Sequence, residues 1–333
     1  MTAMVRVVDR PEQPHVPKSG WTRERLEHQS SPVGVTAYRL EGGSDGARLL
    51  VLAGVHGDEP SGVAAALRVM REVGELVAGS FTIVPVCNEL AWGVATRESP
   101  DDGENLARVF LTGRATQTAK IADVIAERLI HDATAMVDLH TASTPNDMVV
   151  LAGYATGTAT EDRSAVLAEA FGAPFIWRHP TVSPGRTLSA AVEAGVPAIY
   201  VEGPGGGSVD HELVDHYVEG VHRILRHLGM TDGPLAPAVR PCVLVGDGNL
   251  DHVGVPAGAA GLLIRRVDVG EAVDVGQPLV EVHSHLDGGV TEAIAPSAGR
   301  VVSLARERSV ATQERIAVVV SEGRSPDPEV PAL

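Results

Sequence analysis

Strand-like and helix-like segments alternate along most of this chain, and this alternation restricts the fold more than any other feature of the sequence. Residues 81–87 form a nearly continuous apolar run, which is typical of a strand in a sheet that is covered on both faces. Residues 60–73 repeat apolar side chains at helical spacing, at Val63, Leu67 and Met70. The pattern predicts an α/β fold, in which helices flank a mostly parallel or mixed sheet.

The same criteria predict the other elements between residues 35 and 228. Further strands are expected at 35–40, 48–54, 133–139, 148–152, 175–178 and 198–201. Further helices are expected at 116–130, 161–171, 188–193 and 210–228.

The character of the sequence changes after Gly229. Residues 230–241 are rich in Pro and Gly and indicate a linker. Short β-type runs separated by glycines follow, and they predict a small all-β domain at 242–322. The predicted organisation also includes an N-terminal extension at 1–31, the α/β domain at 32–229 and a disordered tail at 323–333.

Charge and cysteine content exclude several classes of function. The chain has 43 acidic and 27 basic residues and a net charge of −16, which argues against binding to nucleic acid or anionic membranes. Its two cysteines, Cys87 and Cys242, exclude a disulfide framework and are compatible with a reducing cytosol. We find no signal-peptide core and no apolar run long enough to span a membrane. We therefore expect a cytoplasmic protein with a small-molecule partner, and homo-oligomer formation stays open.

A histidine and a glutamate three residues apart follow the predicted strand at 48–54. These residues are His56 and Glu59. An imidazole and a carboxylate can chelate one metal ion, and Zn²⁺ accepts both ligand types. A catalytic zinc needs three protein ligands and an open fourth position, so the pair accounts for only part of a site.

Two further predicted strands end in polar residues of the same kind. The strand at 133–139 runs into Asp138 and His140, and the strand at 198–201 runs into Glu202. Sites in open α/β sheets form outside the carboxyl ends of the strands. Because an unpaired carboxylate at a buried strand end is costly, these residues indicate a metal or another partner. The alternatives are caps, salt bridges and other satisfied strand-end groups.

Three short motifs in this order resemble the succinylglutamate desuccinylase/aspartoacylase family, a branch of the zinc carboxypeptidase-like fold. They are H-G-D-E at 56–59, D-L-H at 138–140 and V-E-G-P-G-G at 201–206, and the resemblance covers about residues 48–228. It implies a zinc-carboxypeptidase-like mixed sheet flanked by helices. It also implies one Zn²⁺ per chain, held by His56, Glu59 and His140. Glu202 is then the general base that takes a proton from the attacking water.

Asp138 has two interpretations beside this implied centre. It can orient His140 or a backbone group, or it can simply cap the end of its strand. The sequence does not decide between them.

Residues 88–110 also resemble a segment of the family. Arg97 falls where the family has the arginine that polarises the acyl carbonyl, and Arg108 where it has the arginine that binds a substrate carboxylate. A guanidinium group suits both roles. Asn88 opens the segment and is assigned to substrate binding with Arg108. The alternative for both arginines is that they are surface loop charges.

Two positions in this segment depart from the family pattern. Asn105 stands where the family has Asp, and Ala107 where it has the Asn beside the arginine. Asn105 is also assigned to substrate binding. The loss of an amide donor at Ala107 predicts that hydrolysis is retained with a different substrate.

The C-terminal segment resembles the barrel-sandwich fold of lipoyl and biotinyl domains. The chain has only two lysines, Lys18 and Lys120, so this segment cannot carry a lipoyl or biotinyl group. By analogy it serves as a cover or an oligomer contact. His283 and His285 within it are interpreted as a hairpin surface, with a second metal site as the alternative.

The sequence therefore predicts a zinc-dependent deacylase of amino-acid metabolism. It is expected to cleave the amide bond of a small N-acylated amino acid or related amine. A zinc carboxypeptidase acting on peptides is the nearest alternative. A non-catalytic metal-binding or interaction protein is the alternative from another class.

Overall fold

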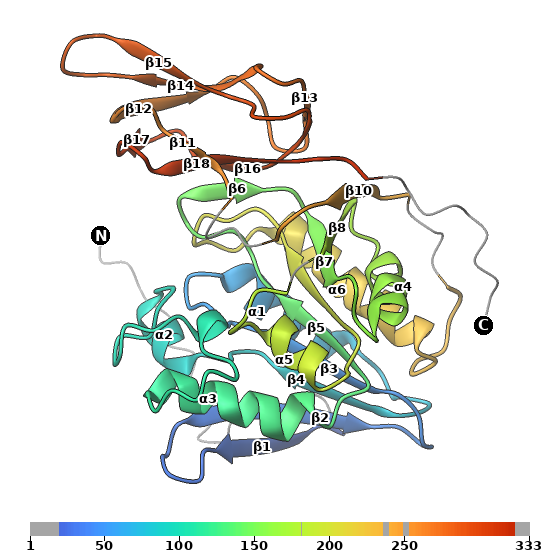
Figure 1. Cartoon of the computed structure of the whole chain (residues 1–333). Helices are drawn as coiled ribbons and strands as arrows, with labels where there is room; N and C mark the ends of the chain where they lie inside the picture. The colour runs from blue at the N-terminus through green and yellow to red at the C-terminus, as the bar shows by residue number, and fades with distance from the viewer. Residues whose placement is uncertain (1–19, 181, 236–239, 249–252, 324–333) are drawn as a thin grey trace, which may run out of the picture.

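A mixed sheet of nine strands forms the centre of the molecule (Figure 1). The computed structural model describes residues 20–180, 182–235, 240–248 and 253–323. The strand order is β1-β2-β4-β3-β5-β9-β7-β8-β10. The strands are β1 (Thr22–Glu27), β2 (Gly34–Glu41), β3 (Arg48–Ala53), β4 (Ser80–Val84), β5 (Ala135–Leu139), β7 (Leu151–Ala155), β8 (Phe175–His179), β9 (Ala198–Glu202) and β10 (Cys242–Val245).

The middle of this sheet is parallel and fully covered. Strands β4, β3, β5 and β9 run parallel, whereas β2 pairs with β4 and β7 pairs with β9 in the antiparallel sense. Every residue of β4 and β5 is buried. The continuous apolar runs of the sequence therefore correspond to strands with helices on both faces, and the predicted mixed α/β sheet is confirmed.

Helices cover the two faces of the sheet and bury two separate apolar cores. Helices α1 (Pro60–Glu72), α4 (Glu161–Phe171) and α6 (His211–His227) pack on one face. On the other lie α3 (Gln117–Ile125), its π-helical continuation η2 (Ala126–Ile130) and α5 (Thr187–Glu193). The short helices α2 (Glu89–Val94) and η1 (Leu106–Arg108) belong to the connection between β4 and α3. Within the described ranges, no helix is both long and apolar enough to cross a membrane.

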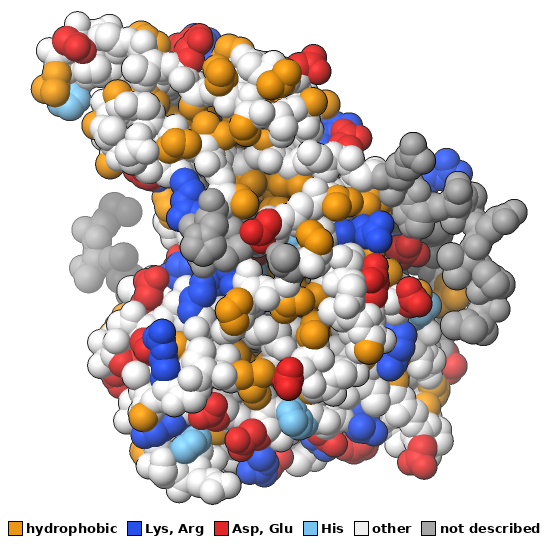
Figure 2. Space-filling view, viewed as in Figure 1, with side chains coloured by type: hydrophobic (Ala, Val, Ile, Leu, Met, Phe, Trp, Pro, Cys, Tyr) orange, Lys and Arg blue, Asp and Glu red, His pale blue; other side chains and the backbone are white. Residues whose placement is uncertain are grey.

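Two smaller antiparallel sheets project from the body of the molecule at the top of Figure 1 and enclose a core of their own. Hydrophobic side chains gather where they meet the body (Figure 2). One sheet contains β11 (Val255–Pro256), β18 (Arg315–Val320), β16 (Gly299–Ala305), β13 (Ala272–Val273) and β6 (Asn146–Met148). The other contains β15 (Val290–Ile294), β14 (Pro278–His283), β12 (Gly261–Arg265) and β17 (Ser309–Val310).

Two of the differences from the predicted elements change the sheet that a strand joins. Residues 148–152 were predicted as one strand, but β6 and β7 are separate strands in different sheets. Met148 is buried against the apolar side chains of β16 and β18, which draw β6 away from the large sheet. Strand β10 falls in the predicted all-β domain but pairs with β8, because its apolar residues cover that edge.

The predicted N-terminal extension contains a strand. Strand β1 pairs antiparallel with β2 along its whole length. It was not predicted, because it is an edge strand in which Leu26 is the single buried residue. Residues 1–19 of the predicted extension, 236–239 of the predicted linker and 324–333 of the predicted tail lie outside the described residues.

Candidate active site

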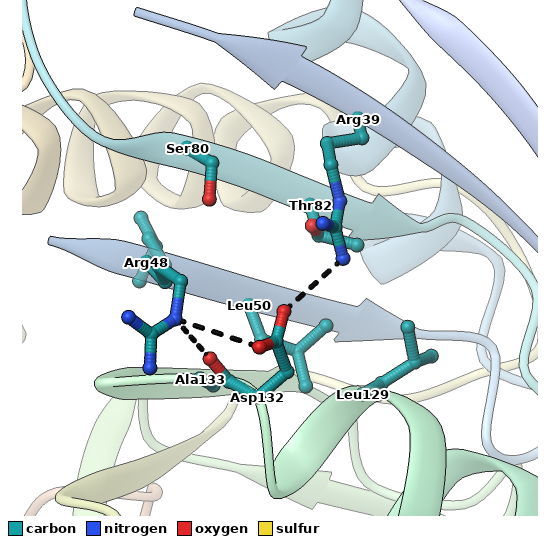
Figure 3. A pocket seen from close by; sticks show the side chains of 9 residues that line it. Arg39, Arg48, Leu50, Ser80, Thr82, Leu129, Asp132 and Ala133 are labelled. Atoms are coloured by element: carbon teal, nitrogen blue, oxygen red, sulfur yellow. Dashed lines mark hydrogen bonds and ion pairs between the residues drawn. The ribbon is translucent and has the colours of Figure 1, made fainter. Parts of the chain in front are cut away.

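A small hollow at the amino ends of the central strands has no catalytic character (Figure 3). Arg39 and Arg48 both point toward Asp132, with distances to its carboxylate of 3.3 Å and 3.7 Å. The cavity volume is about 10 Å³, room for about one water molecule. The Asp132 carboxylate pairs with both guanidinium groups, and these ion pairs join β2 and β3 to the loop before β5. This hollow is therefore a structural ion-pair cluster.

A much larger cavity of about 270 Å³ lies at the opposite, carboxyl ends of the parallel strands. This is the end at which open α/β sheets bind ligands. Among the residues that line it are His56, Arg97, Arg108, His140, Thr187 and Glu202. The loop 141–148 and Ser303 of β16 form another part of its wall.

His56, Glu59 and His140 converge beside this cavity, as predicted. One ligand atom from each lies within 4.8 Å of the others, and all three residues are buried. His56 Nδ1 is 2.7 Å from Glu59 Oε1, and His140 Nδ1 is 3.0 Å from Glu59 Oε2. The loop after β3 supplies the first two residues and the end of β5 supplies the third, since these strands are neighbours.

Gly57 allows the loop between His56 and Glu59 to pack against helix α2. A β-carbon at Gly57 would lie 2.2 Å from the backbone carbonyl carbon and oxygen of Ala91. The amide of Gly57 also donates to the carbonyl of Thr96 at 2.8 Å. The spacing of His56 and Glu59 thus depends on a close backbone approach that only glycine permits.

Hydrogen bonds on the far side of both imidazoles fix their tautomers. Asn105 Oδ1 accepts from the amide of Ala107 at 2.8 Å, which identifies it as the oxygen, and it lies 3.1 Å from His56 Nε2. His140 Nε2 lies 2.9 Å from Asp138 Oδ2. Each Nε2 therefore carries a hydrogen and donates. Neutral rings of this kind direct two Nδ1 lone pairs at the Glu59 carboxylate.

The electrostatics of this group require a cation. Burial opposes ionisation of Glu59, but His56 and His140 outweigh it and hold the pKa of Glu59 well below its usual range. Burial also favours a neutral His140, but Asp138 and Glu59 outweigh it and raise the pKa of His140 well above its usual range. Either an extra proton or a metal ion is thus needed between Nδ1 of His140 and the carboxylate of Glu59.

Glu202 reaches the cavity from the end of β9. Its Oε2 is enclosed and has no hydrogen-bond partner among the residues that the structure describes. Burial raises the pKa of Glu202 to about 8; His140 and Arg97 oppose the shift, whereas Glu59 and Asp138 add to it. A half-buried carboxyl with one enclosed oxygen and a pKa near neutrality is suited to moving a proton.

The two predicted arginines also line the cavity. Arg97 Nη1 donates to Glu59 Oε1 at 3.0 Å, so its charge lies next to the candidate metal position. Arg108 is the last residue of η1, and its Nη1 donates to the carbonyl of Ala107 at 2.9 Å. A carboxylate or a developing oxyanion in the cavity would meet both side chains.

The two predicted asparagines are located differently. Asn88 is fully buried, and its Oδ1 caps helix α2 through the amide of Ala91 and accepts from Ser99, both at 3.1 Å. It is not among the residues that line the cavity. Asn105 contacts His56 and the backbone, as described above. The structure therefore gives the side-chain oxygens of both asparagines positioning contacts, and their contacts with substrate stay a prediction.

Other cavity residues were not predicted from the sequence. Thr187 begins α5 and donates to Asp138, and the cavity lining also includes Arg186, Trp177, His179 and Tyr200. The only available signal was their position in or beside predicted strands and one short helix. That signal does not separate them from ordinary core residues.

Comparison with known proteins decides the family. The family model of the succinylglutamate desuccinylase/aspartoacylase catalytic domain matches residues 45–228, more than half of the chain. The chain belongs to this family. The resemblance inferred from the three motifs is thereby confirmed, and the members of the family are deacylases.

Solved structures of the succinylglutamate desuccinylase/aspartoacylase family match nearly the whole chain. The product-bound ectoine utilization protein EutE (DoeB) from Ruegeria pomeroyi is 26% identical, with a TM-score of 0.79 over 93% of this chain and 98% of that one. A succinylglutamate desuccinylase/aspartoacylase from Rhodobacter sphaeroides is 26% identical, with a TM-score of 0.78 over 92% and 95%. A succinylglutamate desuccinylase from Silicibacter sp. TM1040 shares the fold at 24% identity, with a TM-score of 0.80 over 95% and 99%. No curated protein matches the chain.

Proposed function

We propose that this protein is a zinc-dependent deacylase that hydrolyses the amide bond of a small N-acylated amino acid or related amine. The observation that carries the proposal is the convergence of His56, Glu59 and His140 beside a cavity that also holds the partnerless oxygen of Glu202. Membership of a deacylase family supports the reaction class.

The donor set fits Zn²⁺. Two imidazole nitrogens and one carboxylate form a known catalytic zinc set, which leaves a coordination position for substrate or water. The tautomers fixed by Asn105 and Asp138 turn both Nδ1 lone pairs toward one point, as metal-bound histidines require. Zinc at this point would replace the proton that His140 otherwise needs, and it would supply a Lewis acid that lowers the pKa of water toward about 7.

The side chains of the cavity have separate roles in the proposed reaction. Glu202 takes a proton from the attacking water and delivers it to the nitrogen of the leaving amine. Arg97 stabilises the negative charge that develops on the acyl oxygen. Arg108 binds a carboxylate of the substrate. Asn105 and Asp138 hold the imidazoles of His56 and His140, and Asn88 holds the loop that carries Arg97.

The size and charge of the cavity favour a small acidic substrate. A volume of about 270 Å³ is just below the usual range for ligand pockets, which begins at about 300 Å³. Arg97, Arg108 and Arg186 bring three guanidinium groups to its lining. The small volume favours a small molecule over the alternative of a peptide substrate for a carboxypeptidase. Glu202 Oε2 has no hydrogen-bond partner in the described part of the chain, and this speaks against a non-catalytic metal-binding protein, since such a role gives no reason to enclose a carboxylate oxygen there.

The finer architecture is also a proposal. We infer that the large sheet with its helices is of zinc-carboxypeptidase type and acts as the catalytic domain, near residues 32–229. We infer that the two antiparallel sheets form a barrel-sandwich-like domain within 242–322. Their shared core supports this, while the pairing of β10 with β8 moves its start beyond Val245.

Metal analysis and a substrate screen test the proposal. The purified protein should contain about one zinc per chain, and His56→Ala should lose it. The screen compares N-acetyl, N-succinyl and longer N-acyl amino acids, and it includes hydrolysed ectoine because one relative is an ectoine utilization protein. Glu202→Ala should keep zinc and lose turnover by a factor on the order of 10²–10⁴. Full zinc in His56→Ala, or full activity in Glu202→Ala, would refute the assignment.

A further inference from the structure

One row of residues crosses the sheet beside the candidate metal centre. Tyr200 on β9 pairs in register with Asp138 on β5 and, on its other side, with Gly153 on β7. Gly153 in turn pairs with Trp177 on β8. Side chains in register project to the same face, and so do residues two apart on one strand. Tyr200 therefore shares the cavity face with Asp138 and with Glu202.

Two glycines make room for an aromatic wall on this face. A β-carbon at Gly153 would lie 2.2 Å from the ring of Tyr200, and one at Gly248 would lie 2.1 Å from the ring of His179. The His179 ring stacks on Tyr200 at a centroid distance of 5.5 Å and a plane angle of 20°. His179 and Tyr200 both line the cavity. The wall is thus a built feature of the site.

The hydrogen bonds of His179 fix the direction of the Tyr200 hydroxyl. His179 Nδ1 faces the carbonyl oxygen of Gly246 at 3.4 Å, and a carbonyl can only accept. Nδ1 therefore carries the hydrogen, and Nε2 presents a lone pair to the Tyr200 hydroxyl at 2.5 Å. Tyr200 donates its single proton to His179. Its oxygen keeps lone pairs for a ligand, and the half-buried side chain borders the cavity.

Burial keeps both partners in the required protonation states. It lowers the pKa of His179 to about 4, so the ring is neutral near pH 7. Burial and the nearby Glu202 raise the pKa of Tyr200 well above its usual value, so the hydroxyl keeps its proton. The arrangement thus presents an acceptor oxygen at neutral pH.

Building on the proposed function, we propose that the Tyr200 hydroxyl oxygen accepts the N–H of the scissile amide, with His179 as its positioning residue. The site therefore selects amides over esters. In hydrolysis the oxygen of water bonds to the acyl carbon, the C–N bond breaks, and the nitrogen takes the proton carried by Glu202. Tyr200 transfers no proton. It holds the N–H of the amide and of the released amine, whereas the bridging oxygen of an ester would face it with a lone pair.

Matched amide and ester substrates test this inference. N-acetyl-L-aspartate is paired with O-acetyl-L-malate, and N-succinyl-L-glutamate with O-succinyl-L-2-hydroxyglutarate. If the screen finds an amide that is cleaved faster than these two, that amide is paired with the ester of the same structure. Tyr200→Phe keeps the aromatic ring that packs against Gly153 and removes the hydroxyl oxygen that would accept the N–H of the amide. It should lower kcat/KM about tenfold for the amide and less than about twofold for the ester.

Tyr154→Phe is the matched control. Tyr154 lies next to Gly153 on β7, but its side chain packs into the core on the opposite face of the sheet. This variant should change neither kcat/KM. Zinc content should match the wild type in both variants, and near-wild-type cleavage of the ester by Tyr200→Phe separates loss of a substrate contact from a folding defect.

His179 is tested by a double-mutant cycle. His179→Phe keeps a ring in the stack and removes the acceptor that orients Tyr200. It should reduce the amide preference, and adding it to Tyr200→Phe should cause no further loss, because the two residues act through one hydrogen bond. Additive losses, equal losses on amide and ester, or an unchanged Tyr200→Phe would overturn the inference while leaving the deacylase intact. A wild type that hydrolyses no amide refutes the proposed function, and this inference with it.

Discussion

Thr187 donates a hydrogen bond of 2.5 Å to Oδ2 of Asp138, the same oxygen that accepts from Nε2 of His140. Thr187, the first residue of α5, therefore fixes the Asp138 carboxylate, and Asp138 in turn orients His140, a candidate zinc ligand. All three residues are buried, so solvent does not replace either contact. Of the two interpretations left open for Asp138, this geometry supports orientation of His140.

Thr187→Val should weaken zinc binding without removing a ligand. Valine has the same shape but cannot donate, so Asp138 loses one of the contacts that fix its rotamer. We expect the Kd for zinc to rise about tenfold, as for other groups that support a metal ligand. Titration against a chelating dye measures this. Thr187→Ser keeps the hydroxyl and should restore most of the affinity; equal Kd values for Thr187→Val and wild type would contradict the prediction.

Gly57→Ala should disturb the spacing of His56 and Glu59. Its β-carbon would meet the backbone of Ala91 and Trp92, neither of which can rotate away. We expect a loss of about 1–3 kcal/mol in the free energy of unfolding and a clear loss of zinc affinity. Gly93→Ala in the same helix α2 is the control, because no atom lies within 4 Å of its added carbon. The two variants should differ clearly in thermal unfolding and zinc titration.

Arg97→Gln should lower kcat far more than it changes KM. Arg97 lies 3.0 Å from Glu59, where charge would develop on an acyl oxygen during attack. Loss of one such donor typically costs about 10²-fold in kcat. Arg114→Gln removes an exposed arginine that pairs with Glu104 and should leave kcat unchanged. A rise in KM with unchanged kcat would assign Arg97 to ground-state binding.

Glu202 should make the metal-free protein less stable as pH rises. Its pKa is about 8 in the folded state against 4.5 as the ordinary value, so the unfolded chain releases the proton first. The stability contribution of Glu202 is therefore full below about pH 4.5 and falls as pH rises toward about 8. Glu202→Gln does not titrate. Urea unfolding in EDTA should give a difference in unfolding free energy that increasingly favours Glu202→Gln across this window. Parallel pH curves for the two proteins would contradict the raised pKa.

The sequence predicted the candidate metal centre well because its residues stand where apolar strands end. His56, Glu59, His140 and Glu202 interrupt apolar patterns at positions that a parallel sheet brings to one edge. Their convergence follows from topology alone, without knowledge of side-chain rotamers.

Residues whose role depends on rotamers and strand register were not predictable in this way. The oxygens of Asn88 and Asn105 face backbone amides and His56, and these positioning contacts could not be read from the order of residues in the family motif. Tyr200 was counted within an apolar strand, and only the register opposite Gly153 turns its hydroxyl to the cavity. Strand β6 is short, and a partner more than 150 residues away in the chain determines its sheet.

That pairing has a consequence for how such proteins can be recombined. Strand β6 ends the loop that lines the cavity, and it pairs with β16. The Ser303 hydroxyl donates to the carbonyl of Asp147, and Arg265 donates to the Asp147 carboxylate. The C-terminal sheets are therefore not an exchangeable appendage. Replacing these sheets with those of a relative would change residues that line the cavity. The large sheet and the C-terminal sheets should therefore be exchanged together when such proteins are engineered.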